Sequence, residues 1–335
     1  MIVIIYPTGT KRSVHLNHFV VEAEKADPEC KVISSEEFSL APIDKWPDNT
    51  KFIIRVGSHY IKEVLPVLRQ LWHKGMYTIF PNVPAIKTCS NKILFWQACL
   101  KNNIEVPMTK IFTKGGDDYI PYTSTDFTEF GDCVIKPSIG SLGSGIYYCK
   151  SNEVKNKISQ IIASEDEFYN NCDIIVQKEI KNKRNIPQSI RVFCFNGEPT
   201  VSITLTNTKE LHDKADASLK VKPEVLYNED GEVIDSIGTD LDFESVSNLN
   251  RGGVAGPYFP SDKLKQICRN VCKATGIEFT AIDFIQDELD NFICLEANIS
   301  PHLIRAFMIY KGRVNHAEMI CNHLLDNSNK DSIIL

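Results

Sequence analysis

Short apolar runs alternate with helix-like patterns over residues 1–85. The runs IVIIY and KFIIRVG are largely apolar and rich in β-branched residues, which is typical of parallel strands buried on both faces. Between the second run and YTIFPN, a helical spacing places Ile61, Leu65, Leu68 and Trp72 on one face. This alternation of strand and helix predicts a small N-terminal domain with an open α/β sheet.

Residues 86–175 are expected to form a second, central unit. SNKILFWQACLKNN predicts a helix with Ser90 as its N-cap and Asn102 or Asn103 at its end. IEVPMTKIF is expected to be extended, and GDCVIKPSIGSLGSGIYYCK is typical of two strands joined by a glycine-rich turn. The next segment predicts a helix whose apolar residues share one face: Val154, Ile158 and Ile161.

Residues 176–335 are expected to form a third unit in which antiparallel pairs dominate. DIIVQKEI, at its start, is typical of a buried strand. SIRVFCFNGEPTVSITLT predicts a hairpin because Asn196-Gly197 is a strong turn signal. EFTAIDFIQDELDNFICLEAN predicts a second antiparallel pair across an acidic turn. Amphipathic helices are predicted over SDKLKQICRNVCKATG, which ends at Gly276, and over NHAEMICNHLLD.

Residues 207–247 differ from the rest of this unit because they are polar and charged. Within them, YNEDGEVI has the pattern of a further hairpin. We interpret the segment as either a mobile insertion or a lid, and it is also a candidate docking surface.

Composition and charge narrow the class of protein. The chain has 335 residues, 43% hydrophobic and 24% charged, as expected of a globular protein with a sizeable core. The net charge of −6 gives no global attraction to nucleic acid or to an anionic membrane, so an anionic ligand requires local positive charge. No run approaches the ~20 apolar residues of a membrane span, and MIVIIYPTG lacks the basic start of a signal peptide. These features predict a soluble, cytoplasmic protein.

The chain contains 11 cysteines, which could indicate disulfides or a metal site. There is no C-x-x-C pair and no Cys/His cluster at zinc spacing. Several cysteines lie inside apolar strands, and Cys268 and Cys272 share a helix face with Leu264 and Val271. We therefore expect reduced cysteines that serve as small core residues.

The glycine-rich turn is a candidate anion site. Lys136 ends the preceding strand, and the loop over residues 139–145 offers several backbone N–H groups to one anion. It is neither a P-loop nor a dinucleotide fingerprint, because a strand and not a helix follows it. Taken alone, the segment is more typical of an ordinary hairpin turn.

The antiparallel pair after residue 278 carries candidate metal ligands. Asp283 lies on the first strand, whereas Glu296 and Asn298 lie two apart on the second and so share one face. A hairpin that brings these oxygens together suits Mg²⁺. An isolated acidic residue on a strand is usually solvated, but a carboxylate buried in FICLEANI needs a cation or an arginine beside it.

Two arginines could contact phosphate. Arg251 precedes a Gly-Gly pair in SNLNRGGV, where its fork of donors could reach phosphate or a developing oxyanion, although a surface turn explains it equally well. Arg191 lies inside the strand SIRVF and needs a buried anionic partner, for which a structural salt bridge is the competing interpretation.

Taken together, these motifs resemble the ATP-grasp ligases and, within them, the RimK-like group. The resemblance covers about residues 85–325 and rests on six motifs in the expected order. SNKILFW contains the first lysine, Lys92, and VIKPSIGSLGSGI contains the second, Lys136, with its glycine-rich loop. IIVQKEI matches the hinge strand, SIRVF the D-I-R-V segment, NLNRGG the N-x-x-R-G-G segment, and IDFI with LEANISP the terminal metal motif.

The resemblance implies an α/β (α+β) ATP-grasp fold, in which an N-terminal open α/β pre-ATP-grasp domain precedes two α+β subdomains that clasp ATP. It implies catalytic roles for Arg191, Arg251 and Lys136. It implies Asp283, Glu296 and Asn298 as ligands of one or two Mg²⁺ ions, for which Mn²⁺ can substitute. The implied ATP-binding residues are Lys92, Lys136, Gly140, Ser141, Gly143, Ser144, Gly145, Gln177, Lys178, Glu179, Ile180 and Arg191.

Some positions depart from the family pattern. The usual hinge Q-E is Gln177-Lys178 here, with Glu179 one place later, which puts the ribose-contacting acid in doubt. Ser189 replaces the Asp of D-I-R-V, and His302 stands where the group often has Gly after S-P. These changes suggest altered substrate recognition more than loss of activity.

The function implied is an ATP-dependent carboxylate–amine ligase that forms an amide or peptide bond through an acylphosphate. Its partners would be a small-molecule or peptide carboxylate and an amine, without nucleic acid or membrane, and homo-oligomer formation is left open. The alternatives are a kinase-like phosphotransferase and a non-catalytic nucleotide-binding regulator. Arg55 and His59 follow an N-terminal strand and could hold a substrate carboxylate, although a surface role is at least equally consistent.

Overall fold

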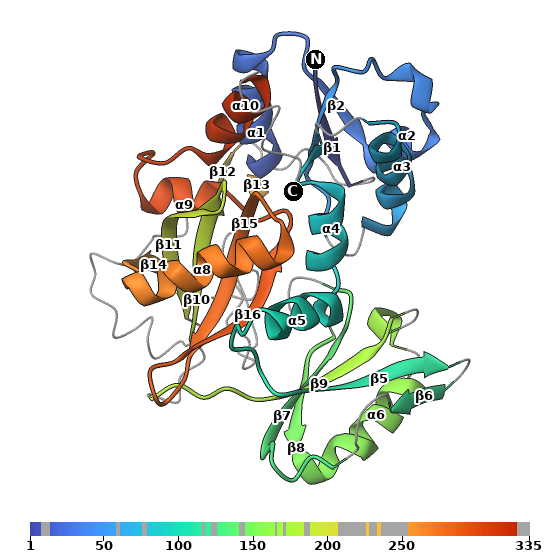
Figure 1. Ribbon diagram of the computed structural model, residues 1–335, viewed down its shortest axis with the longest axis vertical. Helices are drawn as coiled ribbons and strands as arrows, with labels where there is room; N and C mark the ends of the chain where they lie inside the picture. Colours follow the sequence, from blue (N-terminus) through green and yellow to red (C-terminus); the bar gives the residue numbers. More distant parts are fainter. Residues whose placement is uncertain are drawn as a thin grey trace.

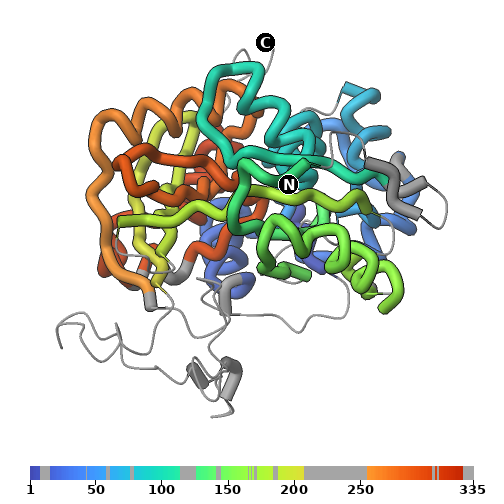
Figure 2. The backbone as a smooth tube through the Cα atoms, turned by 90° about the horizontal axis from the view of Figure 1, so that it is seen from below, coloured from blue at the N-terminus to red at the C-terminus, as the bar shows by residue number. Residues whose placement is uncertain are grey.

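The computed structural model describes most of the chain and has three larger sheets (Figure 1). In Figure 1 the sheet formed by the middle of the sequence lies at the lower end of the molecule, and Figure 2 shows the molecule from that end. The described residues are 1–7, 14–57, 61–75, 79–115, 118–121, 126–140, 145–164, 166–169, 172–183, 188–206, 226–227, 233–235 and 254–326.

The N-terminal sheet is parallel and has four strands in the order β2-β1-β3-β4. Ile2 to Ile5 of β1 are fully buried, which confirms the prediction of a parallel strand covered on both faces. The strand order reverses direction at β1, because β2 pairs with one of its edges and β3 with the other. The elements are β1 (Ile2–Tyr6), α1 (Val14–Ala26), β2 (Lys31–Ser34), α2 (Ser35–Leu40), a 3-10 turn (Ile43–Lys45), β3 (Lys51–Ile54), α3 (Ile61–His73) and β4 (Ile79–Phe80).

The helix α3 forms where the sequence predicts it, but the predicted face is partly wrong. Its buried residues are Ile61, Val64, Leu68 and Leu71, while the predicted Leu65 and Trp72 are only partly buried. Both sets have helical spacing, so periodicity alone places the face only to within about one position. The packing of α3 against its neighbours selects the stripe.

The middle sheet is antiparallel, with five strands in the order β6-β5-β9-β7-β8. Its helix α6 buries Val154, Ile158 and Ile161, as predicted, against a core that includes Cys133 and Val176. The elements are β5 (Thr109–Gly115), β6 (Asp118–Pro121), β7 (Asp132–Pro137), β8 (Tyr147–Lys150), a 3-10 turn (Ser151–Glu153), α6 (Val154–Ala163), a 3-10 turn (Glu167–Tyr169) and β9 (Ile174–Lys178).

The third sheet is also antiparallel and runs β14-β11-β10-β15-β16. Along β10, Val192 and Cys194 face one core and Phe193 faces another, so the sheet is covered on both sides. Asn196 and Gly197 both have positive φ, 51° and 78°, which confirms the predicted tight turn. The elements are β10 (Gln188–Phe195), β11 (Glu198–Thr206), β14 (Val254–Tyr258), α8 (Asp262–Thr275), β15 (Phe279–Gln286), β16 (Phe292–Asn298), α9 (Ile304–Ile309) and α10 (His316–Leu325).

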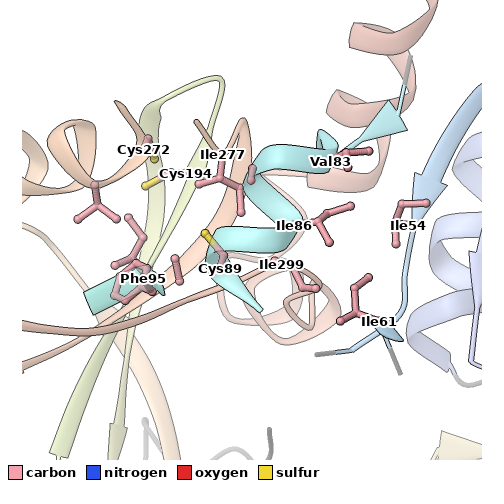
Figure 3. Packing of buried hydrophobic residues seen from close by; sticks show 14 of the residues in the cluster. Ile54, Ile61, Val83, Ile86, Cys89, Phe95, Cys194, Cys272, Ile277 and Ile299 are labelled. Carbon is pink, nitrogen blue, oxygen red and sulfur yellow. The ribbon is translucent and has the colours of Figure 1, made fainter. Parts of the chain in front are cut away.

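Two short helices, α4 (Val83–Cys89) and α5 (Lys92–Lys101), connect the N-terminal sheet to the rest. One hydrophobic cluster contains Ile54 of the first sheet, Ile86 of α4, Phe95 of α5 and Cys194 of the third sheet (Figure 3). The N-terminal sheet and the third sheet therefore share a core through α4.

The predicted N-cap of α5 is wrong by one residue. Ser90 has helical dihedral angles and ends α4, so it cannot adopt the extended backbone of an N-cap. Asn91 is the N-cap instead, and its side chain accepts hydrogen bonds from the backbone N–H groups of Ile93 and Leu94. Asn102 ends the helix, as predicted.

Three further predictions can be compared with the structure. All eleven cysteines are free, and eight of them are buried, which agrees with their expected use as core residues. Within the insertion 207–247, β12 (Leu226–Tyr227) pairs antiparallel with β13 (Val233–Asp235), which confirms the hairpin there; most of the insertion lies outside the described residues. In the described part of the chain, no helix is both long enough and apolar enough to cross a membrane.

Candidate active site

The three predicted metal ligands lie on one face of the β15–β16 pair. Asp283 is directly opposite Glu296, and Asn298 is opposite Ala281, so the three side chains emerge on the same side. Asn298 donates from Nδ2 to Asp283 Oδ2 at 3.2 Å and to the Ala281 carbonyl at 3.1 Å. The register shifts immediately after Asp283, a β-bulge of the kind that redirects side chains near functional sites.

Arg191 forms the closest ionic contact of this group. It lies on β10 opposite Asp283, and its Nε and one terminal nitrogen donate to the two carboxylate oxygens, each at 2.7 Å. Burial lowers the pKa of Arg191, but the charge and hydrogen bonds of Asp283, together with the charge of Glu296, outweigh it and raise the pKa. The structure thus shows the salt bridge that was the competing interpretation for this arginine.

The two predicted lysines lie close enough to Glu296 to feel its charge. Burial lowers the pKa of Lys92, and the negative charge of Glu296 acts against that shift. Burial and the neighbouring Lys92 lower the pKa of Lys136 to about 8, again opposed by Glu296. Lys92 begins α5 and Lys136 lies on β7, whereas Glu296 lies on β16, so the cluster joins the middle and third sheets.

The balance of charge in this cluster is positive. Lys92, Lys136 and Arg191 carry three positive charges, and Asp283 and Glu296 carry two negative charges, which leaves +1 in a chain of net charge −6. An anionic ligand would therefore be attracted here and not by the protein as a whole. The cluster thus provides the local positive charge that a negatively charged protein needs in order to bind an anion.

The glycine-rich loop is described only at its ends. Gly140 accepts a hydrogen bond from Lys92 Nζ at 2.9 Å through its carbonyl, which holds the lysine at the start of the loop. Gly145 has φ of 67°, and its carbonyl accepts from the Tyr169 hydroxyl at 2.5 Å. The remaining predicted residues of the loop, Ser141, Gly143 and Ser144, lie outside the described residues.

Replacing Gly145 with Ala is expected to destabilise the protein by about 2–4 kcal/mol. Left-handed backbone strain contributes about 1 kcal/mol and crowding about 1–3 kcal/mol. The crowding arises because an added Cβ would lie 2.9 Å from Phe168 Cβ. Gly197→Ala is the matched control, since φ is 78° there and the added Cβ meets nothing within 4 Å. Urea unfolding measures both. Equal losses for the two variants would contradict the packing argument.

The predicted hinge residues lie at the end of the central strand β9. Gln177 is buried and donates to Thr109 Oγ1 at 2.9 Å, and the N–H groups of Lys178 and Glu179 donate to backbone carbonyls of neighbouring segments. Burial raises the pKa of Glu179, with Lys181 opposing and Asp132 adding to the shift. Ile180 follows as a half-buried residue. The side chain of Gln177 and the N–H groups of Lys178 and Glu179 thus have protein partners.

One residue that joins the two lysine segments was not predicted from the sequence. Ser138 is 1% exposed, and its carbonyl accepts from the N–H of Lys92 at 2.8 Å. Its hydroxyl accepts from the N–H of Asp173. Its position two residues after Lys136 in VIKPS was the available signal. Of the other predicted residues, Arg251 and His59 lie outside the described part of the chain.

The oxygen atoms of the three predicted metal ligands fit a hard cation, provided that Asn298 contributes its amide oxygen. Among the described residues, no group of three or more His, Cys, Asp and Glu side chains could hold a metal ion. The site therefore needs the amide oxygen of Asn298 beside the carboxylates of Asp283 and Glu296, and this oxygen-only set is the kind that Mg²⁺ prefers. Arg191 would share the Asp283 carboxylate with the ion.

Comparisons with known proteins show what the chain is similar to. Residues 220–323 match the RimK-like ATP-grasp domain, a segment that includes Asp283, Glu296 and Asn298. No curated protein sequence matches the chain significantly.

Solved structures resemble almost the whole chain. D-cycloserine synthetase DcsG has a TM-score of 0.66 at 12% identity, covering 97% of this chain and 98% of its own. D-alanine–D-alanine ligase from Bacillus anthracis, complexed with ATP, has 0.62 at 14%, covering 97% and 95%. The ATP-grasp ligase PsnB, complexed with a minimal precursor, has 0.59 at 14%, covering 96% and 98%. The chain therefore has the ATP-grasp fold, and the match of its C-terminal part to the RimK-like ATP-grasp domain confirms the family resemblance identified in the sequence.

Proposed function

We propose that the protein is an ATP-dependent carboxylate–amine ligase that forms an amide or peptide bond through an acylphosphate. The observation that carries the proposal is the joint cluster of Lys92, Lys136 and Arg191 with Asp283 and Glu296. This cluster combines cationic side chains, which could bind phosphates, with carboxylates, which could hold a divalent ion. Its residues come from the middle and third sheets and from α5. The ATP-grasp fold and the ligase relatives support the same reaction class.

Lys92 and Lys136 would bind the α- and β-phosphates of ATP. Asp283, Glu296 and Asn298 would hold Mg²⁺, which supplies charge neutralisation at the β- and γ-phosphates when bound. Adenine would lie near Gln177 to Ile180 at the end of β9. The glycine-rich loop would cover the phosphates and exclude water, because an acylphosphate hydrolyses readily.

The chemistry consists of two displacements. A carboxylate oxygen of the acid attacks the γ-phosphorus in line, ADP leaves and an acylphosphate forms. An amine then attacks the acyl carbon, the amide bond forms, and phosphate leaves with the carboxylate oxygen. Arg191 and Arg251 would stabilise the transferring phosphoryl group and the tetrahedral intermediate. Such transfers depend on positioning and charge neutralisation.

The substrate class we propose is an amino acid, a small peptide or a protein tail. The relatives support this range, since PsnB is complexed with a precursor and another relative is a D-alanine–D-alanine ligase. The test is a screen of amino-acid and peptide pools for ADP release, followed by mass spectrometry of each hit. A ligase yields free phosphate and a product whose mass is the sum of acid and amine less water. A phosphorylated product without free phosphate would indicate a kinase. Binding of ATP without any release of ADP would indicate a regulator.

Affinity for MgADP is expected to weaken as the pH rises above about 8. The pKa of Lys136 is about 8 in the free protein, and phosphate binding favours the charged ammonium, so the complex has the higher pKa. Between the two pKa values a proton is taken up on binding, and affinity falls by up to about tenfold per pH unit. Calorimetry from pH 7 to 9.5 at constant free Mg²⁺ measures this slope.

The matched control for this pH profile is Lys136→Arg, because arginine stays charged throughout the range. The variant is expected to lose the slope above pH 8. An unchanged slope in the variant would show that Lys136 is not the group that titrates.

A further inference from the structure

Arg55 occupies the point where the N-terminal sheet reverses its strand order. It directly follows β3, and its N–H donates to the Ile5 carbonyl of β1 at 2.8 Å. The chain leaves β1 toward β2 on one side, while β3 lies on the other side. In open parallel sheets, ligands bind outside the carboxyl ends of strands at this kind of switch point.

The contacts of the Arg55 side chain differ from those of Arg191. One terminal nitrogen donates to the Pro301 carbonyl at 2.7 Å, and the guanidinium carbon lies 5.3 Å from the centre of the Phe19 ring. Among the described residues, no carboxylate is paired with it. Burial lowers the pKa of Arg55 to about 10, and no neighbouring charge contributes to that shift. Arg191, by contrast, binds both oxygens of Asp283.

A half-buried guanidinium without a carboxylate in the described structure has lost hydration that an anionic ligand could replace. The planar fork of arginine matches a carboxylate, which accepts two parallel hydrogen bonds. The hydrogen bond to Pro301 and the nearby Phe19 ring restrain the side chain before a ligand arrives.

The position of Pro301 relates Arg55 to the proposed reaction centre. Pro301 comes three residues after Asn298, which is the last residue of β16 and one of the two proposed metal ligands on that strand. Yet Lys92, Lys136 and Glu296 make no contribution to the pKa of Arg55. Arg55 is therefore a second cationic group, separate from the lysine cluster and connected through Pro301 to the segment that follows β16.

We propose that Arg55 binds a substrate carboxylate that the ligation does not consume. This inference rests on the proposed ligase function. The reacting carboxylate must present a free oxygen lone pair to the γ-phosphorus. A guanidinium bound to both of its oxygens would occupy those lone pairs. The carboxylate bound by Arg55 is therefore a different one from the carboxylate that reacts. Two sources share this chemistry: the α-carboxylate of an amino-acid acceptor, and the second carboxylate of a dicarboxylic acid.

The experiment compares free carboxylates with their amides. Acceptor probes are the twenty amino acids and their α-carboxamides; acid probes are aspartate, glutamate and succinate against asparagine, glutamine and succinamate. ADP release and product mass are measured for the wild type, Arg55→Gln and Arg55→Lys. Gln keeps a donor for the Pro301 carbonyl but carries no charge. Arg69→Gln, an exposed arginine on α3, is the matched control.

The wild type is expected to prefer the free carboxylate by about 10- to 100-fold in kcat/KM, in the acceptor set or in the acid set, and the responding set identifies the source. Arg55→Gln should lose that preference, mostly through KM, while MgADP affinity stays unchanged. Arg55→Lys should recover part of it, and Arg69→Gln should behave as wild type.

A wild type without any preference, or an Arg55→Gln variant that keeps the full preference, would overturn the inference while leaving the ligase function intact. Absence of ADP release with every acid would instead contradict the proposed function itself. Unchanged MgADP affinity of Arg55→Gln shows that the variant is folded.

Discussion

Replacing Glu296 with Gln is expected to lower ADP formation at least ~100-fold, comparable with the removal of one preorganised charge from an active site. Glu296 is opposite Asp283 and is close enough to Lys92, Lys136 and Arg191 to affect their pKa values. Gln keeps the shape but removes a negative charge that a divalent cation needs. Only Asp283 then opposes the repulsion between that cation and the nearby lysines.

Steady-state ADP release and the thermal stabilisation given by MgADP both measure this effect. The matched control is Glu288→Gln, an exposed residue in the turn of the same hairpin, which should leave both quantities unchanged. Near-normal ADP release by Glu296→Gln would show that this carboxylate has no role at the metal.

The second large effect concerns the ion pair between Arg191 and Asp283. Arg191→Met should destabilise the protein by about 3–5 kcal/mol, because Asp283 is 7% exposed and would lose its charged partner. The double variant Arg191→Met with Asp283→Asn removes both charges and should recover most of that stability. Neither variant should turn over, because both lack one of the arginines that would stabilise the phosphoryl group, and the double variant also lacks the charge of a proposed metal ligand.

The comparison of stability with activity separates the structural role of Arg191 from its role in catalysis. Urea unfolding gives the free energies, and ADP release gives the turnover. The control is Arg269→Met, whose partner Glu198 lies on the surface, so its loss should cost at most about 1 kcal/mol. A double variant that recovers both stability and turnover would reduce Arg191 to a structural residue.

Local pattern was sufficient to predict much of the fold. The hairpin at Asn196-Gly197 and the β15–β16 pair follow from turn chemistry and from periodicity over neighbouring residues. The prediction that Glu296 and Asn298 share a face requires only the two-residue repeat of a strand. These features depend on contacts close in sequence.

The errors and the missed features depend on distant contacts. The buried stripe of α3 is set by the elements packed against it, and periodicity does not define it to within one position. The bulge that follows Asp283 and the contact of Ser138 with Lys92 require the folded sheets. For Arg191 the sequence indicated an anionic partner but could not select it, and the structure places Asp283 there.

The most direct test of the central claim follows the carboxylate oxygen through the reaction. The acid found in the screen is labelled with ¹⁸O in its carboxylate, and the phosphate released in unlabelled water is analysed by mass spectrometry. Attack of the carboxylate on the γ-phosphorus predicts one ¹⁸O atom in each phosphate formed with product. Phosphate without the label, released alongside amide product, would contradict the acylphosphate mechanism at this site.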